Sequence, residues 1–141
     1  MCLTYSSEMT DSFPTPDMAL THLLVVSDVA SSSQWYQDVL GAEKYREYGT
    51  SAVFSFNETW LLLVEAGDPT ADKPDVEFVL PDHTAVSHSF TIRVPNCAAA
   101  YSTLMGRGAQ FLTPPHDWGS EIRCFFADPD GHLWEISQLA G

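Results

Sequence analysis

Two arginines, Arg93 and Arg123, lie in segments whose alternation of polar and apolar residues predicts β-strands. They are two of only six Lys and Arg residues in the chain, and an unpaired charge within a sheet is costly to bury. Two interpretations stay open. Either the arginines form internal salt bridges with Glu121 and Glu135, or their guanidinium groups hold a carboxylate or phosphate of a ligand, which displaces an internal pair.

Carboxylates beside these arginines are candidates for proton transfer. Glu121 lies two residues before Arg123 on the same face of its predicted strand, and Glu135 lies on the last predicted strand. Because a carboxylate in a partly apolar cleft can have a raised pKa, we interpret Glu121 and Glu135 as the candidate catalytic residues.

Strand alternation also indicates which side chains face a pocket. In "VSHSFTIRV" His88 shares a face with Phe90 and Ile92, and in "LTHLLVVSD" His22 shares a face with Leu24, so both histidines fall on the core side. The opposite faces, together with two tryptophans, supply the candidate substrate-binding residues: Thr21, Ser89, Thr91, Arg93, Arg123, Trp60 and Trp118.

Some of these assignments keep a structural alternative. Trp118 lies in the loop "TPPHDWGSE", which either forms the rim of the pocket or is a plain connection. Trp60 fits the cleft and the core equally well. His132 directly follows the turn "DPDG", and we predict that it faces solvent.

The composition narrows the class of protein. The chain has 141 residues and a formal net charge of −13, so it repels phosphate backbones and anionic lipid, and we expect neither nucleic-acid nor membrane binding. No apolar run approaches the roughly 20 residues that cross a bilayer, and no signal peptide is recognisable. Three cysteines without C-x-x-C spacing, Cys2, Cys97 and Cys124, favour a reduced cytoplasmic protein, with the latter two in the core.

The elements that must position these side chains occur twice. Residues 20–66 and 87–138 each begin with an extended apolar stretch, continue into a short helix and end with three further extended stretches. Asp28 or Ser31 can cap the first helix and Asn96 the second, and a glycine follows each helix. Each half therefore has the order β-α-β-β-β.

We predict an α+β fold of two βαβββ modules, which form a curved mixed sheet around a cleft. The predicted organisation is a flexible N-terminal arm (1–18), a first module (19–66), a linker (67–85) and a second module (86–141). The linker contains the apolar stretch "VEFVL", which is interpretable as an added strand.

The repeat resembles the vicinal oxygen chelate superfamily, which includes glyoxalase I, extradiol dioxygenases, fosfomycin-modifying enzymes and bleomycin-binding proteins. Three stretches carry the resemblance: "SDVASSSQWYQDVLGA", "NCAAAYSTLMGRGAQF" and above all "FFADPDGHLWEISQ". It covers roughly residues 19–138 and implies the glyoxalase-like fold and a homodimer. It does not single out one activity, because this family uses one fold for many reactions.

For a metal site, the resemblance implies the ligands His22, His88 and Glu135 and a divalent ion such as Zn²⁺, Ni²⁺, Mn²⁺ or Fe²⁺. Glu135 lies at the family's spacing after the DPDG turn. The family histidine, however, precedes the Asp or Asn at the helix start by seven residues, and those positions hold Thr21 and Ser89. A slip of one residue reverses the face of a side chain, unless a β-bulge restores the register.

Three functions follow as hypotheses. The first, which we favour, is a glyoxalase-like lyase or isomerase that stabilises an oxyanion with a divalent metal or with a polar pocket. The second is a metal-free protein of the sequestration or resistance type, with an Arg- and Glu-lined pocket for an anionic small molecule. The third is a scaffold subunit without a ligand.

Overall fold

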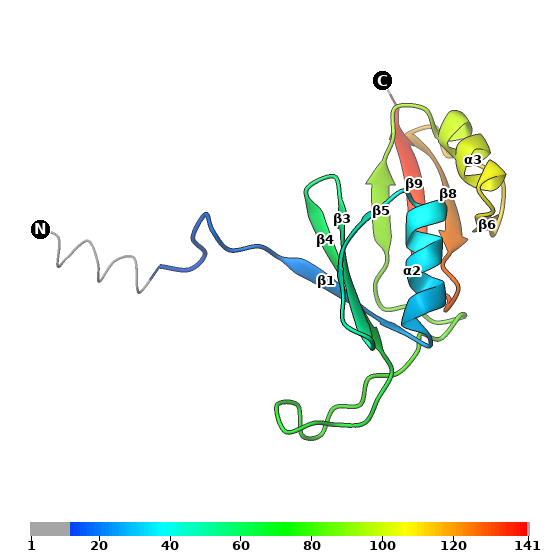
Figure 1. Cartoon of the computed structure of the whole chain (residues 1–141). Coiled ribbons are helices and arrows are strands. Elements are labelled where there is room, and N and C mark those ends of the chain that lie inside the picture. Colours follow the sequence, from blue (N-terminus) through cyan, green and yellow to red (C-terminus); the bar gives the residue numbers. More distant parts are fainter. Residues whose placement is uncertain (1–11, 141) are drawn as a thin grey trace, which may run out of the picture.

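The structure is a computed structural model, and it describes residues 12–140 (Figure 1). The first module contains β1 (Thr21–Val26), α2 (Val29–Asp38), β2 (Glu43–Glu47), β3 (Ser51–Phe56) and β4 (Thr59–Glu65). The second contains β5 (Phe90–Arg93), α3 (Cys97–Gly106), β6 (Gln110–Phe111), β7 (His116–Asp117), β8 (Glu121–Ala127) and β9 (Leu133–Leu139).

Each module forms its own mixed sheet. The strand order is β1-β4-β3-β2 in the first sheet and β5-β9-β8-β6 in the second, where β7 also pairs with β8. In both sheets the first strand runs parallel to the last, and the remaining pairs are antiparallel. The predicted α+β fold with a repeated βαβββ plan is therefore confirmed, with β7 as an addition.

The segments outside the modules contain little regular structure. Residues 12–18 of the predicted arm contain no helix or strand, and the rest of that arm, with Cys2, lies outside the described residues. Between the modules the chain makes only isolated bridges, including one between Gly67 and Phe78, so "VEFVL" does not form an added strand. Within residues 12–140 no helix is long and apolar enough to cross a membrane.

Local side-chain chemistry explains where the helices begin and end. Asp28 rather than Ser31 caps α2, because its side chain accepts a hydrogen bond from the Ala30 backbone N–H, and the Ser31 hydroxyl donates to Asp28. Asn96 caps α3 through the Ala99 backbone N–H at 3.0 Å. Each helix is followed by a glycine in the left-handed region, which ends it.

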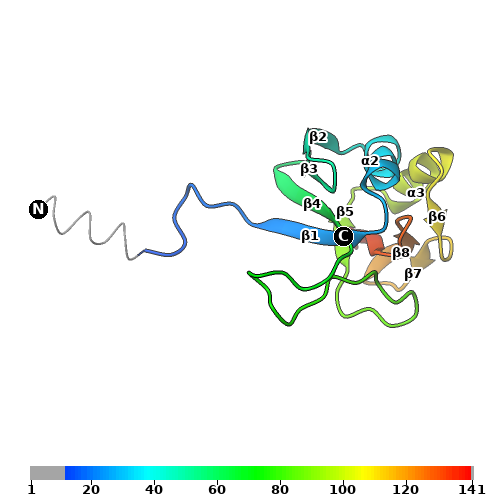
Figure 2. The same ribbon diagram turned by 60° about the horizontal axis from the view of Figure 1, so that its bottom comes forward.

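The two modules share one core, formed by the sheet faces that bear the helices. Tyr36 of α2 is fully buried between them, with its ring 6.2 Å from that of Phe54 in the first sheet and 6.0 Å from that of Trp134 in the second. Cys97 and Cys124 are buried free thiols in this core, as predicted. Figure 2 shows both helices along the same side of the molecule. The sheet faces that carry Leu23 and Thr91 therefore point away from the core.

A buried carboxylate, Asp128, joins the modules at the DPDG turn. Its Oδ2 accepts a hydrogen bond from the Tyr36 hydroxyl at 2.6 Å and lies 2.8 Å from Nδ1 of His132. The prediction that His132 faces solvent is wrong, because only 10% of its side chain is exposed. In the same turn, Asp130 accepts hydrogen bonds from the Ser27 N–H and the Ser32 hydroxyl. The turn is therefore hydrogen-bonded both to the segment that precedes α2 and to the first turn of that helix.

Gly131 in the same turn allows a close approach that another residue would block. Its φ is +96°, and a Cβ at this position would overlap the ring of His83, whose Nε2 donates to the Asp130 carbonyl at 3.0 Å. We predict that Gly131→Ala lowers the free energy of unfolding by about 1–2 kcal/mol, because an L side chain is strained in the left-handed region. Denaturant unfolding measures the change.

Gly106 supplies the matched control for this substitution. It lies in α3 with open space around it, so Gly106→Ala should leave stability unchanged or raise it by up to about 1 kcal/mol. Equal losses for the two alanines would contradict the prediction at Gly131.

Candidate functional site

The outward face of the second sheet carries a group of charged residues, which we call the Arg–Glu cluster: Arg93, Glu121, Arg123 and Glu135. Strand pairing brings them together, because Arg93 and Arg123 both lie opposite Ser137 of β9, one from β5 and one from β8. Side chains at paired positions share a face, so both guanidinium groups project from the same side of the sheet.

Glu121 is the centre of this cluster. Its Oε1 accepts from Nη1 of Arg123 at 2.6 Å, and its Oε2 lies 3.2 Å from Nη1 of Arg93 and 3.0 Å from Oγ of Ser137. Nη1 of Arg93 also donates to Oγ of Ser137 at 2.6 Å. One carboxylate therefore holds both arginines on the same face of the sheet.

Glu135 lies beside this centre with a different set of partners. Its Oε1 accepts from the Thr91 hydroxyl at 2.5 Å, and its Oε2 lies 3.8 Å from Nε of Arg123. Only 12% of its side chain is exposed, against 57% for Arg93 and 38% for Arg123. The carboxylate is thus shielded, while the two guanidinium groups remain open to a ligand.

Trp118 and His116 lie beside the Arg–Glu cluster. The guanidinium carbon of Arg123 lies 5.3 Å from the centre of the Trp118 ring, and that ring lies 4.3 Å from the ring of His116. A cation over an indole face is favourable, so Trp118 restricts the directions that Arg123 can take.

The neighbours of Glu121 lower its pKa, which corrects the expected increase for this residue. Hydrogen bonds from Arg123, Ser137 and Arg93, in that order, outweigh the effect of burial. Since the folded pKa lies below the ordinary value of 4.5, Glu121 contributes stability above that pH and loses the contribution as the pH falls through the folded pKa. Glu121 is therefore better suited to holding arginines than to accepting protons.

A titration can check this assignment. We predict that the side-chain carboxyl carbon of Glu121, followed by NMR, titrates with a midpoint below 4.5, and that Arg123→Met raises the midpoint by removing the largest cause of the shift. A midpoint that Arg123→Met leaves unchanged would mean that the salt bridge is not formed in solution.

The remaining predicted ligand-binding residues do not join the cluster within the described part of the chain. Thr21 and Trp60 pair across β1 and β4 on the outward face of the first sheet, where Trp60 meets Tyr45 with ring centres 5.4 Å apart. Ser89 lies just before β5 and borders the groove described next.

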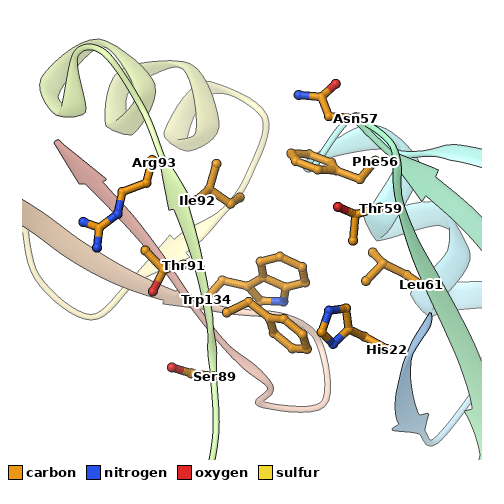
Figure 3. A pocket seen from close by; sticks show the side chains of 11 residues that line it. His22, Phe56, Asn57, Thr59, Leu61, Ser89, Thr91, Ile92, Arg93 and Trp134 are labelled. Carbon is orange, nitrogen blue, oxygen red and sulfur yellow. The ribbon is translucent and has the colours of Figure 1, made fainter. Parts of the chain in front are cut away.

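A groove of about 440 Å³ opens between β5 and the first sheet (Figure 3). The expectation was a cleft lined by the polar faces, but this groove is lined chiefly by the other faces, because the modules meet through the sides that bear helices. Its main walls are formed by His22, Phe56, Leu61, Phe90, Ile92 and Trp134. Phe56, Leu61 and Ile92 were not predicted as lining residues. Period-two alternation placed Ile92 on the core face, and nothing local indicated a gap there.

The three residues implied as metal ligands do not converge. The rings of His22 and His88 each meet the ring of Phe90, at 5.3 and 5.2 Å, whereas Glu135 pairs with Thr91 and lies on the other face of β9 from Trp134. Neither β1 nor β5 contains a bulge that would restore the register. Among residues 12–140 no three His, Cys, Asp or Glu side chains are grouped as metal ligands, so these residues do not fit the family's metal site.

Comparison with known proteins identifies relatives of the whole repeat. A family model described as "Glyoxalase/Bleomycin resistance protein/Dioxygenase superfamily" matches residues 19–136. The chain is 30% identical over 121 residues to a protein named metallothiol transferase FosB from Lysinibacillus sphaericus (strain C3-41), a match that covers 84% of this chain and 80% of the relative. A FosB of Staphylococcus haemolyticus (strain JCSC1435) is 29% identical over 112 residues, covering 79% and 76%.

Solved structures agree with the fold. A glyoxalase/bleomycin resistance protein/dioxygenase from Nocardioides superimposes with a TM-score of 0.68 at 21% identity, covering 99% of this chain and 93% of that one. A lactoylglutathione lyase from Agrobacterium tumefaciens gives 0.64 at 17% identity, covering 87% and 94%. The fosfomycin resistance protein FosX from Listeria monocytogenes gives 0.65 at 14% identity, covering 89% and 96%.

Proposed function

The chain belongs to the glyoxalase/bleomycin resistance protein/dioxygenase superfamily, and we propose that it is a small-molecule lyase or isomerase that binds an anionic substrate at its Arg–Glu cluster without a metal ion. The observation that supports this most is the arrangement of two partly exposed guanidinium groups beside a shielded carboxylate, Glu135. Thr21 and Ser89 occupy the positions at which metal-dependent members have histidines.

The cluster divides the chemistry between its members. Arg93 and Arg123 bind the substrate carboxylate, and Glu135 accepts a proton from a hydroxyl-bearing carbon next to a carbonyl group. The electron pair of that C–H bond forms an enediolate, whose oxygen accepts a hydrogen bond from Arg123. Glu135 then returns the proton to the former carbonyl carbon while the hydroxyl proton passes to the former carbonyl oxygen, so that the hydroxyl and carbonyl groups exchange places in the isomer. Thr91 holds Oε1 of Glu135 during this transfer.

We further propose that the protein is a homodimer in a reducing cytoplasm. Apolar side chains of β1 and β4, including Leu23 and Leu62, lie on the outward face of the first sheet, and 40% of Leu23 is exposed. A second copy would cover it. Sedimentation equilibrium of the protein and of the Leu23→Lys variant tests this, because the added charge should lower the measured mass from that of two chains towards that of one. The free thiols of Cys97 and Cys124 support the proposal of a reducing cytoplasm, where cysteines stay unpaired.

Hydrogen exchange at carbon tests the catalytic proposal. The protein is incubated in D₂O in the presence of EDTA with small carboxylates that carry a ketone or a hydroxy ketone group, and loss of the C–H signal next to the ketone carbonyl is followed by proton NMR. We expect exchange that Glu135→Gln abolishes and that EDTA leaves unchanged. Exchange that requires an added metal, or that survives Glu135→Gln, contradicts the proposal.

A second candidate, binding without turnover, is favoured by the complete internal pairing of the cluster, in which Glu121 already joins both arginines. Binding of the carboxylates without exchange would select this function. The metal- and thiol-dependent transfer named for the FosB relatives is the competing activity. Metal analysis of protein purified without chelators would support it by finding about one ion per chain.

A further inference from the structure

We infer that the groove between β5 and the first sheet is a second binding site, for a small uncharged aromatic molecule that carries one hydrogen-bonding group, such as a phenol. It lies chiefly on the opposite side of β5 from the Arg–Glu cluster, because Phe90 and Ile92 alternate with Thr91 and Arg93 along the strand, and the latter two reach only its border. Figure 3 shows Ile92 directed into the groove and Arg93 directed away from it. Its volume of about 440 Å³ is within the range of small-molecule sites. The inference does not depend on the proposed enzymatic function.

The floor of the groove is a fixed aromatic surface. The rings of Phe90 and Trp134 are stacked with centres 4.5 Å apart and 23° between their planes. Trp134 is buried, and its Nε1 donates to the Tyr36 hydroxyl at 3.3 Å, so the indole cannot turn away. Rigid aromatic surfaces favour planar ligands, which lose little conformational freedom on binding.

The opposite wall supplies hydrogen-bonding groups that have no partner in the described chain. Figure 3 shows His22 and Thr59 directed into the groove from the first sheet, with Asn57 at its upper edge. Within residues 12–140 no hydrogen bond reaches the side chains of these three residues, and the one ring contact of His22 is its edge-to-face approach to Phe90 at 5.3 Å. A neutral imidazole offers one donor and one acceptor, which suits a hydroxyl group.

The charges around the groove favour an uncharged ligand. Among residues 12–140 no carboxylate lines it, and Arg93 at its border is turned to the other face, where it bonds to Glu121 and Ser137. A neighbouring hollow of about 220 Å³ shares Phe56 and Ile92 with the groove and has an almost wholly apolar lining. An apolar extension of the ligand therefore has space to continue between the modules.

Neutral probes and a pair of tryptophan variants test the inference. We expect 1-naphthol to bind, with intermolecular NOEs to the Trp134 indole. Ile92→Trp, which fills the groove, should lower this affinity at least about tenfold, whereas Leu139→Trp, at an exposed position of β9 outside the groove, should change it less than about twofold. His22→Phe should lower the affinity for 1-naphthol about fivefold and leave that for naphthalene unchanged.

Other outcomes overturn the inference. These are no binding of 1-naphthol at millimolar concentration, NOEs to another part of the protein, or equal affinity in Ile92→Trp. If Ile92→Trp does not fold, Thr59→Trp fills the groove from the opposite wall and replaces it. If the filled variant changes the monomer–dimer equilibrium but not naphthol affinity, a second copy occupies the groove and the inference is wrong. None of these results alters the carbon-exchange test, which reports on the other face of β5.

Discussion

Replacing Asp128 by alanine is expected to lower the free energy of unfolding by about 3–5 kcal/mol. The buried carboxylate accepts hydrogen bonds from the Tyr36 hydroxyl at 2.6 Å, from the His132 backbone N–H at 2.8 Å and from the Asp130 N–H at 3.0 Å. Removing it leaves these donors buried without a partner and disconnects α2 from the DPDG turn. Denaturant unfolding of the full chain measures the loss.

Two further variants make this result interpretable. Asp38→Ala removes an exposed carboxylate that only accepts from Gln34, and it should cost less than about 0.5 kcal/mol. Tyr36→Phe should cost about 1–2 kcal/mol, because it removes one of the three donors. Burial and the adjacent Asp128 also raise the pKa of Tyr36 well above its ordinary value, so the phenol remains a donor in alkaline solution. A loss below about 1 kcal/mol for Asp128→Ala would show that the contact between the modules is weak.

Replacing Arg123 by methionine is expected to weaken the binding of an anionic probe, benzoate, by about 10- to 100-fold. Its guanidinium group is the more shielded of the two and is held by Glu121 and the Trp118 ring, so the bond it donates is charge-assisted and directed. Arg93→Met should have a smaller effect, because its side chain is 57% exposed and solvent screens its charge. Isothermal titration gives both affinities.

Two variants separate a specific loss from a change in net charge. Arg46→Met removes a positive charge from an exposed strand, β2, and should leave benzoate binding unchanged. Glu121→Gln should strengthen binding, since the internal carboxylate then no longer competes with the ligand for Arg93 and Arg123. Weaker binding in Glu121→Gln would mean that this carboxylate serves mainly to position the arginines.

The sequence allowed the repeated module, the helix ends and the faces of the strands to be predicted, because each depends on nearby residues. His22 follows the alternation of β1, and that rule was sufficient to question its role as a metal ligand. The prediction that His88 lies on the core side is wrong, because this residue precedes β5 and is exposed. Strand alternation cannot tell which faces of two sheets will meet. The bond between Tyr36 and Asp128 joins residues 92 positions apart, and no local pattern indicates it.

The wrong prediction at His132 also arises from contacts between residues that are distant in the sequence. A histidine after a tight turn is usually exposed, but here α2 of the other module delivers Tyr36 to the same carboxylate, and the imidazole is enclosed with it. The groove was not predicted because its walls come from both modules. Phe56 and Ile92 come from different modules, and the gap between them depends on how the modules pack rather than on either strand.

Because β5 is only four residues long and uses both of its faces, its register against β9 decides which side chains reach each surface. A shift of the strand by one position would rotate every side chain to the opposite side. Arginine and threonine would then enter the aromatic groove, and Phe90 and Ile92 would cover Glu135. Homologues that preserve both surfaces should therefore keep this register and place changes of length in the exposed loop before Phe90.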